Sequence, residues 1–234
     1  MSKTIVETAP TVFTKAFDRE DYGKVLVIGP TGNGKSYLSK TANRDTTGYI
    51  NPERKPLPYK GTFKFTGKPK TWSGFLKNIE DYGKNPEITH MIIDSQSMAF
   101  EMLHGEMKAN FKGFDIYANY NKEIAKYFDL IRNINKDIIV ISHDETLVDQ
   151  GYKQRKAKVH GKEFEGRVEA YYTIVLFADK KLKDGKPSFF LRTFQEDTTT
   201  KVPEGLFDSS DITDPLEIPN SASFIFEALD RYYS

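Results

Sequence analysis

Residues 29–36 read GPTGNGKS, directly after the apolar run VLVI (25–28) and directly before the stretch YLSKTANR (37–44). The spacing G-x-x-x-x-G-K-S, with a strand before it and a helix after it, is typical of a phosphate-binding loop. Glycines let the backbone wrap around a phosphate with its N–H groups turned inward, and a following helix adds its positive end. The alternative is an ordinary glycine-rich turn with a solvated lysine. The stretch therefore predicts a nucleotide-binding α/β protein.

The positions of this stretch have distinct expected roles. Lys35 is placed to reach the β- and γ-phosphates of ATP, and the Ser36 hydroxyl is placed to bind Mg²⁺. The glycines shape the backbone of the loop. The expected nucleotide contacts are Gly29, Pro30, Thr31, Gly32, Asn33, Gly34, Lys35, Ser36 and Tyr37.

Length and composition set the limits of the prediction. The chain has 234 residues, of which 38% are hydrophobic, and this is enough for one substantial core. We expect one domain over 1–234, with an N-terminal extension at 1–20 and a tail and helix at 206–234. A formal net charge of +1 and the absence of cysteine exclude a polyanion-coating protein, disulfides and thiol chemistry. Without a signal peptide or membrane span, we expect a soluble, cytoplasmic protein.

Strand-like and helix-like segments alternate along the chain. Continuous apolar strands separated by helices favour a mostly parallel sheet with helices on both faces. The expected strands are 24–28, 46–50, 90–94, 137–142, 172–178 and 188–194, and the expected helices run from the phosphate loop to about Arg44, near 73–82, over 116–135 and over 221–233. The last two strands are joined by KKLKDGKP, whose Asp-Gly suits a hairpin turn. The last helix has Ser221 as its expected N-cap.

A phosphate loop needs a second acid for its metal ion, and that acid should end an apolar strand. The stretch HMIIDS supplies Asp94 at such a position. The carboxyl ends of parallel strands are where α/β proteins bind ligands, so Asp94 is expected to hold Mg²⁺ directly or through water. The alternative is a strand that simply ends at the surface.

The motifs together point to one group of phosphate-loop proteins. GTPases read guanine with Asn-Lys-x-Asp after a strand, whereas NKDI (135–138) has its Asp one place early and precedes its strand. The combination of GPTGNGKS, YINPERKPLP (49–58), HMIIDS and VISHDE (140–145) resembles the RecA-like ATPases over roughly residues 20–205. It is most similar to small phage-type ATPases linked to single-strand annealing and recombination. This resemblance implies a RecA-like core and a phage-encoded protein of the host cytoplasm.

The resemblance also implies residues for γ-phosphate sensing and hydrolysis. In RecA-like ATPases the strand after the metal-binding one lies beside the phosphate-loop strand, which makes Ser142 and His143 the expected sensors. Hydrolysis needs a carboxylate that orients water. Glu53 stands at the corresponding place after TTGYINP, and Glu101 on a following helix is its rival. The alternatives are a histidine that satisfies its own loop and acids that are merely solvated.

Two basic segments follow the catalytic strands, where RecA-like proteins carry DNA-binding loops. They are 103–122 and 151–162, and both combine lysines with aromatic residues. Basic side chains bind nucleic-acid phosphates and tyrosines stack on unpaired bases. The expected contacts to single-stranded DNA are Lys153, Arg155, Lys156 and Lys158, with Tyr117, Tyr120 or Tyr152 as stacking residues. A solvated loop and a basic lid over a substrate phosphate are the alternatives.

A cation from a neighbouring subunit completes the γ-phosphate site in RecA-like filaments and rings. The resemblance makes Arg192 or Lys201 the expected in-trans cation and predicts self-association into an oligomer or filament. An ordinary strand-edge cation is the alternative. The sequence thus favours an ATP-dependent DNA-binding protein that uses Mg²⁺. A small-molecule kinase and a nucleotide-gated binding module without turnover remain open.

Overall fold

The GPTGNGKS stretch follows the inner strand β1 of a mixed sheet. The computed structural model describes residues 19–149, 151–208, 214 and 216–234. The strand order is β3-β2-β4-β5-β1-β7-β8-β9, and β6 pairs with β5 off this path. The strands are β1 (Lys24–Gly29), β2 (Thr47–Ile50), β3 (Phe65–Gly67), β4 (His90–Asp94), β5 (Asp137–Asp149), β6 (Tyr152–Ala157), β7 (Ile174–Lys183), β8 (Lys186–Arg192) and β9 (Glu217–Pro219).

The central part of the sheet is parallel and buried on both faces. The pairs from β3 across to β7 are parallel, whereas β7–β8, β8–β9 and β5–β6 are antiparallel. In β1, Leu26 and Ile28 pack into one core cluster while Val25 and Val27 pack into the other. Burial on both faces explains why these strands are continuous apolar runs.

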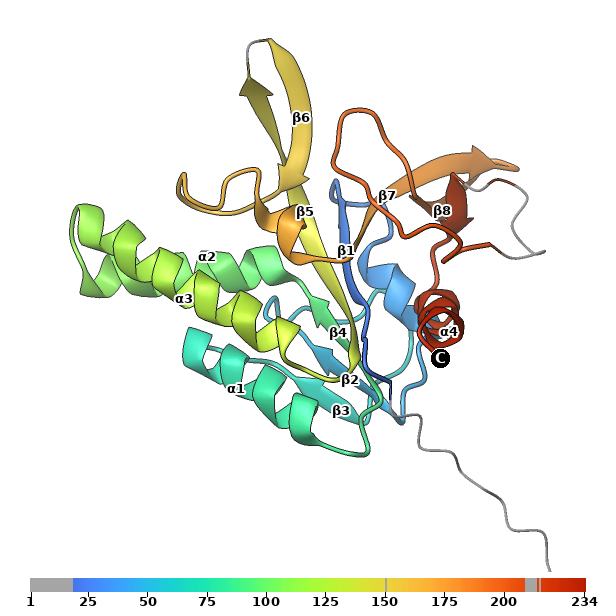
Figure 1. Ribbon diagram of the computed structural model, residues 1–234, viewed down its shortest axis with the longest axis horizontal. Helices are drawn as coiled ribbons and strands as arrows, with labels where there is room; N and C mark the ends of the chain where they lie inside the picture. The colour runs from blue at the N-terminus through green and yellow to red at the C-terminus, as the bar shows by residue number, and fades with distance from the viewer. Residues whose placement is uncertain (1–18, 150, 209–213, 215) are drawn as a thin grey trace, which may run out of the picture.

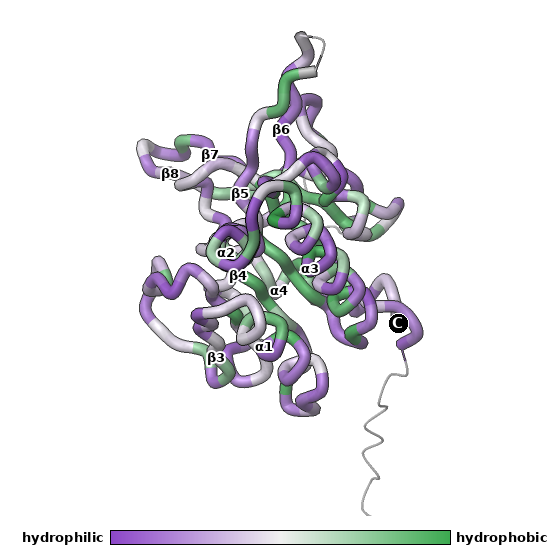
Figure 2. The backbone as a smooth tube through the Cα atoms, turned by 90° about the vertical axis from the view of Figure 1, so that its left-hand side faces the viewer, coloured by the Kyte–Doolittle hydropathy of each residue, from purple (hydrophilic) through white to green (hydrophobic). Residues whose placement is uncertain are grey.

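Helices cover the two faces unequally (Figure 1). The first three helices share a core cluster with one face, and α4 and η1 pack on the other. Figure 2 shows the hydrophobic strands enclosed by more hydrophilic outer segments. The helices are α1 (Trp72–Lys84), α2 (Gln96–Asn110), α3 (Phe114–Arg132) and α4 (Ala222–Tyr232), with the 3₁₀ segments η1 (Ser36–Thr41) and η2 (Val168–Tyr171). These layers confirm the predicted α/β class.

The C-terminal hairpin and helix form as predicted. Asp184 and Gly185 connect β7 and β8 with φ values of 52° and 73°. Positive φ at both turn residues matches the twist of a two-residue hairpin. The Ser221 hydroxyl accepts a hydrogen bond from the Phe224 N–H and caps α4. Part of the predicted 206–234 tail, residues 209–213 and 215, lies outside the described residues.

Three segments differ from the prediction. The helix expected to reach Arg44 is only the short η1, because the Asn43 side chain accepts the Asp45 N–H and forms a local turn. Residues 103–115, expected to carry a loop, are mainly helical and have a break at Gly113 between α2 and α3, whereas 116–122 lie in a helix as predicted. Residues 152–157 are strand β6, so the second basic segment is half of a β-hairpin.

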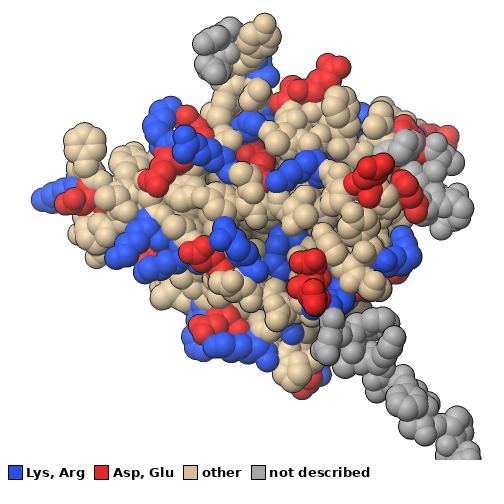
Figure 3. All heavy atoms as spheres, viewed as in Figure 1, with Lys and Arg blue, Asp and Glu red and all other residues tan. Residues whose placement is uncertain are grey.

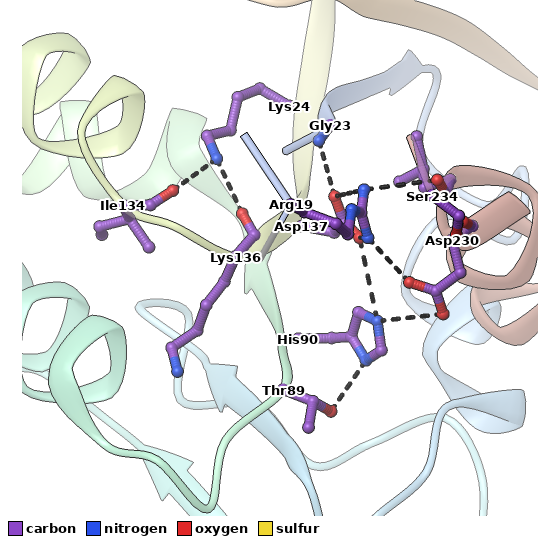
Figure 4. Close-up of polar contacts among 11 residues, drawn as sticks. Arg19, Gly23, Lys24, Thr89, His90, Ile134, Lys136, Asp137, Asp230 and Ser234 are labelled. Carbon is purple, nitrogen blue, oxygen red and sulfur yellow. Dashed lines mark hydrogen bonds and ion pairs between the residues drawn. The ribbon is translucent and has the colours of Figure 1, made fainter. Parts of the chain in front are cut away.

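A charged cluster joins Arg19 and the C-terminal helix α4 to the sheet (Figure 4). The Arg19 guanidinium lies 2.8 Å from the carboxylates of both Asp137 and Asp230. The His90 Nε2 lies 4.0 Å and 3.9 Å from the same two carboxylates.

Except for Arg19 and Glu20, the N-terminal extension predicted at 1–20 lies outside the described residues. Among the described helices, none has the length and apolarity to span a membrane.

Candidate nucleotide-binding site

The phosphate-loop sequence forms a tight turn between β1 and η1. Gly32 and Gly34 adopt φ values of +83° and +78°, which L side chains rarely accept. A Cβ atom on Gly34 would lie 2.5 Å from Cγ of Phe189, so only glycine allows the ring to approach this closely. Asn33 donates to the Ala178 carbonyl at 3.1 Å and ties the loop to β7.

Lys35 lies inside this loop. Its Nζ donates to the carbonyl oxygens of Gly29 at 2.6 Å and Pro30 at 2.8 Å. Burial lowers the pKa of Lys35, and the negative charges of Asp144, Asp94 and Glu53 oppose that shift. The loop therefore presents a largely buried cation to any phosphate that enters it. Because η1 has only six residues, we assign no part of phosphate binding to a helix dipole.

Asp94 ends β4 within reach of the Ser36 hydroxyl. The Tyr49 hydroxyl donates to Oδ2 of the Asp94 carboxylate at 2.7 Å, and the Ser36 hydroxyl lies close enough to favour the ionised carboxylate. Burial raises the pKa of Asp94, while these hydrogen bonds favour the ionised form. A hydroxyl and a carboxylate are hard oxygen donors of the kind that Mg²⁺ prefers. The pair Ser36 and Asp94 therefore fits the predicted magnesium site.

Glu53 lies beyond the end of β2 in a network with three donors. Its Oε1 is 3.2 Å from both the Ser95 Oγ and the His143 Nε2, and its Oε2 is 2.9 Å from the Lys55 Nζ. The His143 hydrogen bond, helped by Lys55, lowers the pKa of Glu53 to about 2 against the effect of burial. The carboxylate is therefore ionised at neutral pH. Asn51 accepts the Arg54 N–H at 2.8 Å and holds the turn that carries Glu53.

Sensor candidates Ser142 and His143 lie on β5 beside the phosphate-loop strand. β5 pairs with both β4 and β1, and the register places His143 opposite Gly29. The fully buried Ser142 donates its hydroxyl hydrogen to the His143 carbonyl at 3.1 Å. His143 instead contacts Glu53. Of the two sensor candidates, His143 has its side chain beside Glu53, whereas the Ser142 hydroxyl is hydrogen-bonded to the backbone.

Most of the predicted nucleotide-site residues converge on one cavity of about 560 Å³, whose lining does not include Gly29, Pro30 or Asn33. Its lining includes Lys35, Ser36, Glu53, Asp94 and His143. It also includes residues that the sequence did not single out. These are Tyr49, Asn51, Lys55, Pro56, Pro58, Ser95, Ile141 and Phe189. Five of them lie in the YINPERKPLP stretch, which has no spacing signal, and Phe189 comes from a hairpin distant in sequence.

A second cavity of about 410 Å³ adjoins the first and shares Thr31 and His143 with it. Its other lining residues are Pro30, Ser97, Met98, Glu101, Asp144 and Lys158. Glu101, the rival of Glu53, accepts from the His160 Nε2 at 2.6 Å and lies 3.7 Å from the Lys158 Nζ. Among the residues lining the first cavity, Glu53 is present and Glu101 is not.

The predicted DNA contacts lie on the β5–β6 ribbon, which comprises residues 144–149 and 152–157, and just beyond it. Arg155 pairs with Asp197 at 3.1 Å and lies 5.3 Å from the Phe177 ring centroid, so it fastens the ribbon to the sheet. Lys156 donates to the Thr199 hydroxyl. Lys153 lies near the exposed tip. Because neighbouring strand residues face opposite sides, Lys153 and Arg155 share one face of the ribbon and Lys156 lies on the other.

The predicted stacking tyrosines also separate. Tyr152 is 77% exposed at the ribbon tip and Tyr117 is 44% exposed on α3, whereas Tyr120 is fully buried. Tyr120 therefore belongs to the core, because it faces inward on the same stripe as Ile124 and Tyr127. Of the three, only Tyr117 and Tyr152 are accessible to a base.

The two predicted in-trans cations differ in how the structure holds them, Arg192 through its side chain and Lys201 through its backbone. Arg192 lies 2.8 Å from Asp179 and 3.6 Å from Glu217. Lys201 pairs through its backbone with Val175, near the start of β7, and burial lowers the pKa of its ammonium. Neither lines the nucleotide cavity.

The fold and this site together define a phosphate-loop NTPase core. A family model described as an AAA domain matches residues 21–204. Since the match spans most of the chain, the protein belongs to this AAA-domain family, one of the phosphate-loop NTPase families. Comparison with curated proteins gives no match. Family membership supports nucleotide binding, with ATP and Mg²⁺ as the typical ligands of the family.

Proposed function

We propose that the chain is a Mg²⁺-dependent ATPase in which Glu53 orients the attacking water. The observation that carries this proposal is the convergence of Lys35, Asp94 and Glu53 on one cavity. They follow three different strands, β1, β4 and β2, whose carboxyl ends meet at the same edge of the sheet.

Each of these side chains has a separate task. The Lys35 ammonium attracts the β- and γ-phosphates, and Ser36 with Asp94 holds Mg²⁺, which would neutralise charge developing on the phosphates. The ionised Glu53 accepts a hydrogen bond from the attacking water and orients it. His143 shares Oε1 of Glu53, so a contact between His143 and the γ-phosphate would release this oxygen for water.

Matched glutamate variants test the assignment. Glu53→Gln should keep ATP affinity within about threefold but lower turnover by about 10²-fold or more, since positioned proton acceptors contribute at least that much. Glu101→Gln is the control and should retain wild-type turnover. Lys35→Ala should lose nucleotide binding or turnover while remaining folded. Normal turnover in Glu53→Gln together with its loss in Glu101→Gln would reverse the assignment.

We further propose that nucleotide state controls binding to single-stranded DNA, in a phage-type role in annealing or recombination. The supporting observation is that β5 runs without interruption from the sheet, through His143, into the β5–β6 ribbon. The ribbon projects from the body and carries the exposed Tyr152 and Lys153 at its tip (Figure 1). Stacking together with phosphate contact is the chemistry that single strands require.

The proposed DNA-binding surface is small, because acidic side chains lie among the basic ones and several basic side chains are already paired. On the face in Figure 3, basic and acidic side chains are interspersed. Arg155, Lys156 and Lys158 already have partners within the chain. We therefore propose that Lys153 and the tyrosines Tyr152 and Tyr117 make the principal contacts. Self-association with Arg192 or Lys201 as in-trans cation belongs to the same proposal. It requires Arg192 to leave Asp179 and Glu217, or the Lys201 ammonium to become more exposed.

Turnover and oligonucleotide affinity measured together test the DNA role. We expect single-stranded DNA to stimulate ATP turnover, and its affinity to differ between ADP and a non-hydrolysable ATP analogue. The affinity should also fall with salt, by about 0.7 log units per log unit for each phosphate contact. Turnover that ignores DNA, with no salt-dependent binding in either nucleotide state, contradicts the DNA role but leaves the ATPase proposal intact.

The second cavity favours one alternative, a small-molecule kinase. It opens beside Thr31 and His143, and its acid Asp144 contributes most to offsetting the lowered pKa of Lys35. A hydroxyl acceptor in this cavity would meet a carboxylate close to the transferred phosphate. Transfer of labelled γ-phosphate to an added acceptor would support the kinase, and release as inorganic phosphate supports the ATPase. Tight binding without either product would indicate a nucleotide-gated module.

A further inference from the structure

One side of the phosphate loop carries an aromatic wall, formed by Tyr37 and Phe189. Their ring centroids are 5.8 Å apart at an interplanar angle of 45°. Tyr59 supports the wall, with its ring 6.1 Å from Tyr37 in an edge-to-face arrangement. Both wall residues are partly exposed and both line the nucleotide cavity. Each ring therefore leaves part of its surface open to a ligand in the cavity.

The rings of the wall are held in place from several directions. Phe189 packs so closely on Gly34 that a Cβ atom there would lie 2.5 Å from its ring. Asn220 donates to the Gly34 carbonyl at 2.9 Å, on the same side of the loop. The Tyr37 hydroxyl accepts from the Lys40 Nζ at 2.8 Å. The wall is therefore preorganised before any ligand binds, which reduces the entropic cost of binding.

The wall belongs to the part of the nucleotide cavity that the second cavity does not share. The second cavity marks the γ-phosphate end, because it shares Thr31 and His143 with the nucleotide cavity but neither ring of the wall. Pro56 and Pro58 also line the nucleotide cavity but not the second one. A triphosphate with its γ-phosphate towards His143 thus directs the rest of the nucleotide towards apolar and aromatic surface.

We propose that the nucleobase binds against this wall and is recognised mainly by its ring face. This inference rests on the proposed nucleotide-binding function and assigns the part of the cavity that the phosphate residues do not use. Every base presents a π-face, so stacking is tolerant of base identity. Purines offer the larger face. We therefore expect ATP and GTP to bind within about tenfold of each other, and both more tightly than UTP.

Removal of the ring face should weaken nucleotides but not bare phosphates. Loss of base–aromatic stacking corresponds to a weakening of about 5- to 150-fold. Inorganic tripolyphosphate has no base, so its affinity for the loop should change less than about twofold. Phe189→Leu keeps bulk against Gly34 but removes the π-face, and Phe189→Trp restores a face. Phe194→Ala, at a ring that is 56% exposed and outside the cavity lining, is the matched control.

The experiment is a set of calorimetric titrations with ATP, GTP, UTP and tripolyphosphate against the wild type, Tyr37→Ala and the Phe189 and Phe194 variants. Melting curves establish that each variant is folded. Weaker ATP and GTP binding with unchanged tripolyphosphate binding in Phe189→Leu and Tyr37→Ala, and recovery in Phe189→Trp, support the inference. Equal losses for ATP and tripolyphosphate, or no loss for either, overturn it. If the wild type binds neither ATP nor tripolyphosphate, the proposed nucleotide-binding function itself is contradicted.

Discussion

Gly34→Ala is the substitution whose cost can be worked most directly from the structure. At φ +78° an L residue adopts the left-handed backbone conformation, which costs about 1–2 kcal/mol. The new Cβ would also lie 2.5 Å from Cγ of Phe189 and 2.9 Å from Nδ2 of Asn220. Such overpacking adds about 1–3 kcal/mol, so we expect a total loss of about 2–5 kcal/mol in the free energy of unfolding.

Gly32→Ala separates the two contributions. Gly32 has a similar φ of +83°, but a Cβ there meets only the Lys180 Nζ at 3.7 Å. Its cost should therefore be the backbone strain alone, about 1–2 kcal/mol. Combining Gly34→Ala with Phe189→Ala removes the partner of the clash and should recover most of the overpacking term. The remaining contact with Asn220 lies at the end of a side chain that can shift.

Urea denaturation of the wild type, the single variants and the double variant measures these differences as a double-mutant cycle. The expected coupling between Gly34→Ala and Phe189→Ala is about 1–3 kcal/mol. Equal costs for Gly34→Ala and Gly32→Ala, with no coupling to Phe189, would refute the reasoning. That result would mean that the ring does not press on the loop in solution.

Three further expectations concern other parts of the chain. Tyr49→Phe removes a donor from the buried Asp94 carboxylate and should lower the free energy of unfolding by about 1.5–3 kcal/mol in urea denaturation, whereas an unchanged value contradicts the contact. Burial lowers the pKa of His90, so the folded state binds fewer protons than the unfolded state and stability should fall as the pH drops below about 6.5. His90→Gln should flatten this part of the stability–pH curve, and an identical curve would assign the effect elsewhere. Arg155→Ala should destabilise the fold, whereas Lys153→Ala should leave stability within about 0.5 kcal/mol and reduce the salt slope of DNA binding by about 0.7; the opposite pattern would exchange their roles.

The elements that were predicted correctly follow from local rules. The core of β1 is a short apolar run before a glycine-rich turn, and the Asp184-Gly185 turn requires only two positive φ values. The phosphate loop, Asp94 and the β7–β8 hairpin were therefore recognisable without knowledge of the fold. Glu53 and His143 needed the resemblance as well, because only the strand order brings them together.

The features that were missed depend on partners far apart in sequence. Tyr49 donates to Asp94 only because β2 lies beside β4 in the sheet. Phe189 reaches the phosphate loop only through the hairpin register. The basic run at 151–162 predicts a loop because its charged residues give no alternating apolar pattern, whereas residues 152–157 form strand β6. The sequence also does not indicate that Arg155 contacts Asp197 and Phe177. Composition alone does not reveal which charges are already paired.

The short η1 changes how the phosphate loop is supported. A long helix after the loop would hold it by packing, but η1 has six residues, and the loop is instead clamped by the C-terminal part of the chain. Lys180 donates to the Gly32 carbonyl at 3.2 Å and Asn220 to the Gly34 carbonyl at 2.9 Å. The Thr41 hydroxyl at the end of η1 lies 3.0 Å from that of Ser221. The AAA-domain match ends at residue 204, before two of these contacts. The contacts that support the phosphate loop and η1 therefore extend beyond the matched region, to Asn220 and Ser221 just before α4.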